Sequence, residues 1–331
     1  MTTTSRRQLL GWAAACTAAG PFSLPRAFAA DGFPRKPVTL VVPFAPGGNL
    51  DLVARAIAPA LQDALGQSIV VDNRAGAGGA IGAAAVARAE ADGHTLLVTT
   101  PNALVVLPRM VKTTYALASF EPVGLVSSTA LVLATSANNK KLPDAATLLR
   151  ETRANPGRLT AGHAGPGTTN HVALMLIEDA AGVRFNLVAY KGSAPALVDA
   201  IGGQIDLICD QLSSSLQHIQ SGALRPLAVL SRERDPQLPQ VPTLHEAGVT
   251  NFDATTATGL LAPRGTPAAA TATLNAALAK ALADPTVRQR LQTIGSTPRP
   301  LAPDAFGRLL RQEDQRAQKL AQSGRLVGGN T

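Results

Sequence analysis

The fold is decided by the stretch Val38–Asp51, which reads VTLVVPFAPGGNLD. Its first five residues are mostly β-branched or aliphatic and predict a buried strand. Prolines and glycines follow, so the chain must turn there, and Asn49 or Asp51 can cap a helix that runs to Leu65. Gly66 is the expected stop of that helix. The stretch therefore predicts a strand, a glycine loop and a helix in direct succession.

The same unit repeats at once. A second strand is predicted over Ser68–Asp72, a glycine loop over residues 73–79, and a helix over Ile81–Ala89. A third strand, Thr95–Thr99, follows the turn at Asp92-Gly93. Short apolar runs that alternate with helical stretches rich in alanine and leucine are typical of α/β proteins with mainly parallel strands.

The pattern restarts in the second half of the chain. Val123–Thr135 is expected to be extended, Thr255–Leu261 to return to the first lobe, and the tail from Pro267 to be mostly helical. Between them we predict strands near Arg158–Ala161, Asn186–Tyr190, Ile205–Cys209 and Arg225–Leu230, with helices beginning near Thr168, Ala194 and Ser213. The predicted lobes are residues 30–135 with 255–331, and residues 136–254. Ligands of open α/β sheets lie beyond the carboxyl ends of the strands, here in the cleft between lobes.

The first 29 residues have the order of a secretory signal. Arg6 and Arg7 precede an apolar run, and the small residues Ala27 and Ala29 predict cleavage before Ala30. The paired arginines resemble a twin-arginine signal, although general secretory signals also contain such pairs. A lipoprotein signal through Cys16 is an alternative, but it leaves a very short apolar region. We expect a periplasmic protein.

Charge and aromatic content narrow the ligand class. The chain has a formal net charge of +8, and removal of the signal takes away three arginines and no acid, which leaves +5. No basic cluster with interleaved aromatics occurs, so an acidic small ligand is favoured over nucleic acid. The only tryptophan, Trp12, lies in the signal, which argues against stacked bases or sugars. Cys209 is expected to be a buried strand thiol.

Three glycine-rich segments follow predicted strands and precede predicted helices: residues 46–48, 76–79 and 162–167. Glycine lets the backbone approach a ligand, and helix N-termini present free N–H groups, so such loops suit a carboxylate or a phosphate. One such loop is commonly only a tight turn, whereas three in one chain favour binding. None keeps the spacing of a P-loop or of a Rossmann fingerprint.

Seven motifs, taken in order along the chain, resemble those of one protein family. They are Pro43–Arg55, Asn73–Gly82, Ala91–Leu97, Gly162–His171, Tyr190–Asp199, Leu238–Gly248 and Ala262–Pro267. The chain resembles the substrate-binding proteins of tripartite tricarboxylate transporters, the Bug-type receptors. The resemblance implies an α/β periplasmic-binding-protein fold of type II, with two lobes that close over a small carboxylate. That ligand would be a di- or tricarboxylate, an acidic amino acid or an aromatic acid.

The resemblance also implies ligand contacts on both lobes, made by backbone N–H groups, hydroxyls and ordered water. The candidate ligand-binding residues are Phe44, Ala45, Gly48, Gly78, Gly79, Thr100 and Asn102 on the first lobe, and His163, Thr168, Thr169, Asp199 and Asp210 on the second. The two acids stand where a carboxylate receives a ligand ammonium or hydroxyl, or orients water. His163 replaces a frequent serine. Its imidazolium could pair with a ligand carboxylate near pH 6.5, or the ring could hydrogen-bond locally.

An enzyme is the competing interpretation. Ser213–Ser215 and His218 place serine and histidine at helical spacing, but no Gly-x-Ser-x-Gly elbow occurs, and a helix cap with a surface histidine is the simpler explanation. The histidines show no metal-ligand spacing, so no metal or cofactor is expected. We therefore predict a monomeric, non-enzymatic receptor that serves membrane permease subunits. A receptor that signals through a membrane sensor is the alternative.

Overall fold

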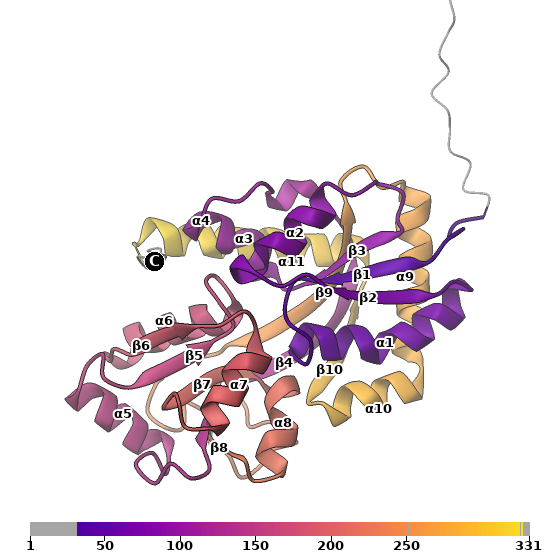
Figure 1. Cartoon of the computed structure of the whole chain (residues 1–331). Coiled ribbons are helices and arrows are strands. Elements are labelled where there is room, and N and C mark those ends of the chain that lie inside the picture. The colour runs from indigo at the N-terminus through magenta and orange to yellow at the C-terminus, as the bar shows by residue number, and fades with distance from the viewer. Residues whose placement is uncertain (1–31, 251, 325, 327–331) are drawn as a thin grey trace, which may run out of the picture. The chain divides into compact units, whose positions relative to one another are not determined.

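Strands and helices alternate along the chain (Figure 1). The structure, a computed structural model, describes residues 32–250, 252–324 and 326, so the predicted signal and its cleavage site lie outside the described residues. The strands are β1 (Val38–Val42), β2 (Ile69–Asn73), β3 (Thr95–Thr99), β4 (Phe120–Ser136), β5 (Thr160–His163), β6 (Asn186–Ala189), β7 (Leu207–Gln211), β8 (Leu224–Val229), β9 (Thr255–Pro263) and β10 (Ser296–Leu301). The α-helices are α1 (Asn49–Leu65), α2 (Ala80–Ala87), α3 (Pro101–Val105), α4 (Leu107–Met110), α5 (Ala145–Ala154), α6 (Thr169–Ala181), α7 (Ser193–Ile201), α8 (Leu212–Gln220), α9 (Ala268–Ala283), α10 (Pro285–Thr293) and α11 (Pro303–Gln322).

The strands join in one sheet with the order β2-β1-β3-β9-β4-β7-β5-β6, and β8 and β10 pair with β4. In the first half, β1 is parallel to both β2 and β3. In the second half, β5 is parallel to β6 and β7. Because these parallel strands are joined by helices, their carboxyl ends carry the loops that begin α1, α6, α7 and α8.

Strand β4 connects the two halves. Its residues up to Ala130 pair with β9, whereas those from Leu131 onward pair with β7 and β8. β4 and β9 are antiparallel, so two strands cross between the halves side by side. The pairing thus changes partners a few residues before the lobe boundary predicted near Ser136, and the assignment of the lobes to residues 30–135 with 255–331 and to 136–254 stays a proposal.

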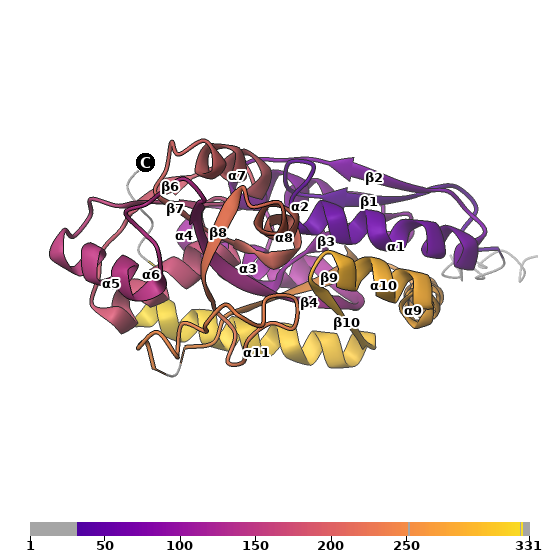
Figure 2. The ribbon, with the colours of Figure 1, turned by 90° about the horizontal axis from the view of Figure 1, so that it is seen from below.

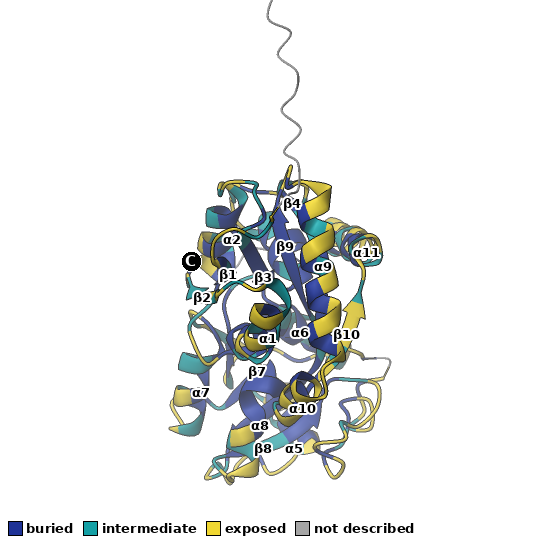
Figure 3. Cartoon of the chain, turned by 90° about the vertical axis from the view of Figure 1, so that its right-hand side faces the viewer, coloured by how far each residue is buried: buried dark blue, intermediate teal, exposed yellow. Residues whose placement is uncertain are grey.

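Two hydrophobic clusters each lie within one half, and a third joins Val172 of α6 to residues of the first half. One cluster packs α1, α9 and α10 against β1 and β3, with Leu40, Ile57 and Leu278 almost completely buried. Another consists only of residues between Leu131 and Phe252. Figure 3 shows α9 with an exposed stripe on its outer face, and its buried residues include Leu274 and Leu278. Helix α11 runs past β10 and continues toward α6 (Figure 2), and it contacts β4 and α3.

Several sequence predictions for individual elements are confirmed. β1 and β3 have the predicted bounds, and Gly66 ends α1 in a left-handed conformation. The predicted helix cap is wrong, because Gly48 is the N-cap of α1 and makes no side-chain capping bond. Asp51, in the first turn, reaches back to the N–H of Gly47 instead. The predicted helical tail also contains the strand β10.

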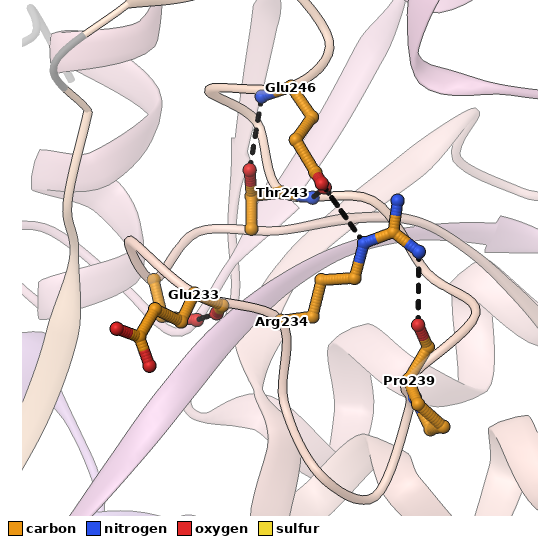
Figure 4. A network of polar contacts seen from close by, with 6 residues as sticks. Glu233, Arg234, Pro239, Thr243 and Glu246 are labelled. Atoms are coloured by element: carbon orange, nitrogen blue, oxygen red, sulfur yellow. Dashed lines mark hydrogen bonds and ion pairs between the residues drawn. The ribbon is translucent and has the colours of Figure 1, made fainter.

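The loop between β8 and β9 is held by Arg234 (Figure 4). Its Nε donates to both carboxylate oxygens of Glu246, at 3.1 and 3.0 Å, and its Nη1 donates to the carbonyl of Pro239 at 3.0 Å. Glu246 also accepts the N–H of Thr243 at 2.7 Å. These contacts give the Leu238–Gly248 motif a structural role in organising a surface loop.

Candidate functional site

A polar network shapes the loop after β1. Asp51, which is 3% exposed, accepts the N–H of Gly47 at 2.9 Å and the guanidinium of Arg55 at 3.0 Å. Arg55 also donates to Asn73, whose amide donates to the carbonyl of Phe44 at 3.1 Å. Burial acts to raise the pKa of Asp51, but the hydrogen bonds from Arg55 and Gly47 prevail and lower it. The network thus ties the first glycine loop to the end of β2.

Two stacked histidines support the loop after β5. The rings of His163 and His171 lie 4.3 Å apart with an interplanar angle of 16°. His163 Nδ1 accepts the N–H of Gly165 at 3.2 Å, and His171 Nδ1 accepts that of Gly167 at 3.1 Å. Burial lowers the pKa of His163 to about 3, with a further contribution from His171, and lowers the pKa of His171 to about 4. Both rings are therefore neutral at neutral pH and act as acceptors for backbone N–H groups.

The loops of the two halves meet closely. A Cβ added to Gly78, in the loop after β2, would lie 2.3 Å from the carbonyl oxygen of Pro166, in the loop after β5. The N–H of Ala45 donates to the carbonyl of Lys191 at 3.4 Å. Ser213 Oγ donates to Oδ1 of Asn49 at 2.7 Å. These contacts describe a closed arrangement of the two sets of loops.

A cavity lies where these loops meet. Its lining residues carry no formal charge; they are Phe44, Gly48, Asn49, Leu50, Thr100, Ala164, Thr168, Thr169, Asn170, Ser193 and Gln211. Four of the longer helices begin at this cavity, because Gly48, Thr168 and Gln211 are the N-caps of α1, α6 and α8, and Ser193 is the first residue of α7. Helix N-termini carry unpaired N–H groups and positive partial charge, so the cavity suits an anion without any lysine or arginine.

The side chain of Asn170 is the strongest single indication of a ligand in this cavity. It is 1% exposed and lines the cavity, yet neither its Nδ2 nor its Oδ1 has a hydrogen-bond partner among the described residues. A buried polar group without a partner costs about 1–3 kcal/mol. An amide that offers one donor group and one acceptor to a cavity is thus most simply completed by a polar ligand.

The comparisons with known proteins agree with this geometry. Residues 53–326 match the model of the tripartite tricarboxylate transporter family receptor. The chain belongs to this family. Solved structures of similar proteins include the periplasmic binding protein BugD, with 34% identity and a TM-score of 0.84 over 88% of this chain and 99% of that one.

Two further solved structures of this kind contain ligands. MatC from Rhodopseudomonas palustris, with bound malate, is 35% identical with a TM-score of 0.83, over 87% of this chain and 100% of that one. Rpa4515 of R. palustris, with adipate, is 35% identical with a TM-score of 0.83, over 88% and 97%. The receptor family and the periplasmic-binding-protein fold expected from the sequence are thereby confirmed, and the family consists of solute-binding proteins.

The cavity of this family member brings together some of the predicted contacts. Those that line it are Phe44, Gly48, Thr100, Thr168 and Thr169. Ala45, Gly78 and Gly79 belong to the surrounding loops but do not line it. Asn102 instead lines a second, larger groove between α6 and α11, which shares Thr169 with the cavity.

The remaining predicted contacts lie behind the cavity lining or away from it. His163 supports the loop and makes the local hydrogen bonds of the second alternative. Asp199 accepts the hydroxyl of Tyr190 at 2.7 Å. Asp210 is fully buried and accepts three serine hydroxyls, including that of Ser193. Direct ligand contact by these three residues stays a prediction.

Several lining residues were not among the predicted ligand contacts: Asn49, Leu50, Ala164, Asn170, Ser193 and Gln211. For two of them the local sequence indicated a place in the site. Asn170 directly follows Thr168 and Thr169, whose hydroxyls were predicted to bind, and Ser193 follows Gly192 at a helix start. Gln211 carried no such signal, because only the end of β7 places it opposite the other loops.

The features considered for an enzyme have other roles here. Ser213 donates to Asn49, and Ser214 and Ser215 donate to Asp210; no hydrogen bond joins one of these hydroxyls to the ring of His218 in the part of the chain described. Within residues 32–250, 252–324 and 326, no group of three or more metal-ligating side chains is present. Among the same residues, no helix has the length and apolar character needed to cross a membrane. Cys209 is confirmed as a buried free thiol.

Proposed function

We propose that this receptor captures a small organic carboxylate in the periplasm and presents it to membrane permease subunits. The observation that carries the proposal is the open amide of Asn170 in an uncharged cavity at the N-termini of α1, α6, α7 and α8. Backbone N–H groups at these termini can share the negative charge of a carboxylate. The malate and adipate in related structures support this ligand class, and family membership supports delivery to a permease.

Ligand binding would stabilise the closed arrangement. Phe44, Gly48 and Asn49 line the cavity from the first half, whereas Thr168, Asn170 and Ser193 line it from the second. A ligand that contacts both halves binds the closed form better than an open one and shifts the equilibrium toward it. The proposed periplasmic location rests on the predicted signal, and delivery would be tested by loss of uptake after deletion of the gene.

The binding test uses protein that begins at Ala30, freed of bound ligand by unfolding and refolding. Thermal unfolding is measured with di- and tricarboxylates, acidic amino acids and aromatic acids. A ligand at about 100 times its dissociation constant stabilises the folded state by about 2.7 kcal/mol, so a cognate acid produces a clear shift. Flat curves for the whole panel would contradict carboxylate binding.

The Asn170→Ala variant tests the observation itself. A hydrogen bond to a charged group contributes about 1.5–3 kcal/mol, so its loss should weaken carboxylate binding at least tenfold by calorimetry. Asn186→Ala, at an exposed position in β6, is the matched control and should leave affinity unchanged. Equal affinities for Asn170→Ala and the unaltered protein would remove this amide from the site.

A further inference from the structure

Ser193 lines the cavity, and its hydroxyl proton is donated to Asp210. It is the first residue of α7, is 5% exposed and lines the cavity. Its Oγ donates to Oδ1 of Asp210 at 2.5 Å and lies 3.3 Å from Oε1 of Gln211, and the single proton favours the shorter contact with the carboxylate. A serine hydroxyl has one proton to donate and two lone pairs to accept with. Toward the cavity, Ser193 therefore presents lone pairs and no proton.

Asp210 holds this orientation firmly. It is completely buried at the end of β7, and its Oδ2 accepts the hydroxyls of Ser214 at 2.5 Å and Ser215 at 2.8 Å. Three hydroxyl donors directed at one carboxyl group match an ionised carboxylate, which only accepts. Rotation of the Ser193 proton toward the cavity would leave a buried carboxylate oxygen short of a donor, which is costly.

A second hydroxyl in the cavity lining has its proton committed in the same way. Thr168 Oγ1 donates to the carbonyl of Gly165 at 2.7 Å and accepts the N–H of His171 at 3.4 Å. The cavity thus combines two kinds of groups. N–H groups at the helix starts favour carboxylate oxygens, whereas the Oδ1 of Asn170 has no partner and needs a donor, and Ser193 Oγ has lone pairs with which to accept one.

We propose that Ser193, oriented by Asp210, determines specificity by accepting a hydrogen bond from a hydroxyl group on the bound carboxylate. The inference rests on the proposed function and narrows it to hydroxycarboxylates. An ammonium group would also donate, but no residue of the lining carries negative charge, and the helix N-termini oppose a cation there. The carboxylate of Asp210 is already occupied by its serine donors. A hydroxyl supplies the donor without a charge.

Pairs of acids that differ by a single hydroxyl test this assignment. Binding is measured by calorimetry for malate against succinate, 2-hydroxyglutarate against glutarate, and citrate against tricarballylate, with aspartate to represent an ammonium donor. In every pair that binds, the hydroxylated acid should bind at least about tenfold more tightly, because its absence leaves an acceptor unpaired. Malate should also bind more tightly than aspartate.

Variants separate the role of Ser193 from a general effect on binding. Ser193→Ala should bring the affinity ratio of each pair close to one, because the acceptor for the ligand hydroxyl is removed for both acids. Asp210→Asn, which allows the Ser193 proton to turn toward the cavity, should lower the same ratio. Ser221→Ala, at an exposed position just after α8, is the matched control and should keep it.

The outcomes of this experiment are distinct. A hydroxylated acid that binds no better than its partner, or a ratio that Ser193→Ala leaves unchanged, overturns the inference while carboxylate binding stands. Tighter binding of aspartate than of malate assigns the acceptor to an ammonium and overturns the choice of a hydroxyl. Failure of every acid in the panel to bind overturns the proposed function itself.

Discussion

The stacked histidines predict a specific loss of stability in mild acid. An unfolded histidine has a pKa of 6.5, whereas burial lowers the values in the folded protein to about 3 for His163 and about 4 for His171. The folded state then binds fewer protons than the unfolded chain, so stability is complete above about pH 6.5 and falls as the pH drops toward the folded values. At pH 5 the unfolded chain is about 1.5 pH units below its pKa. One pH unit corresponds to about 1.36 kcal/mol, so each ring lowers the free energy of unfolding at pH 5 by about 2 kcal/mol, and the two rings together lower it by about 4 kcal/mol.

Urea unfolding at pH 7 and pH 5 measures this loss. The free energy of unfolding is compared between the unaltered protein, the two single variants His163→Gln and His171→Gln, and the double variant. Each variant is compared with itself at the two pH values, so its own change in stability at pH 7 cancels. The double variant should lose about 4 kcal/mol less than the unaltered protein between pH 7 and pH 5. The same loss in both proteins would refute burial of two neutral rings.

Two further predictions concern backbone and thiol. Gly78→Ala should weaken ligand binding at least tenfold, because its Cβ would strike Pro166 only when the loops close. Gly66→Ala is the control, because Gly66 has a similar positive φ of +67 but open space around it. This control should lose stability but keep its affinity for the ligand. Cys209 should react with a thiol reagent only at the rate of unfolding, because burial raises its pKa well above the usual range. Rapid modification of the folded protein would contradict its burial.

Much of the fold could be predicted from local sequence. β1 and β3 are short apolar runs bounded by turn residues, and such runs in a parallel sheet are buried whatever their neighbours. The cap of α1 could not be predicted, because the sequence offers both Asn49 and Asp51, and only the course of the glycine loop directs Asp51 to the N–H of Gly47. β10 was missed because its exposed, proline-containing sequence has no strand pattern; pairing with β4 makes it a strand.

The sequence by itself determined that this protein is built from glycine loops that open helices, and therefore that an anion is the expected ligand. Local spacing encodes such units, because helix and strand periods involve only neighbouring residues. Which helix starts share one cavity was decided by the tertiary structure, since strand order brings Gly48, Thr168 and Ser193 together. The same holds for the open amide of Asn170 and for the Ser193 proton held by Asp210, 17 residues away. Hydrogen bonds between residues that are distant in the sequence depend on tertiary packing, which a local sequence pattern does not determine.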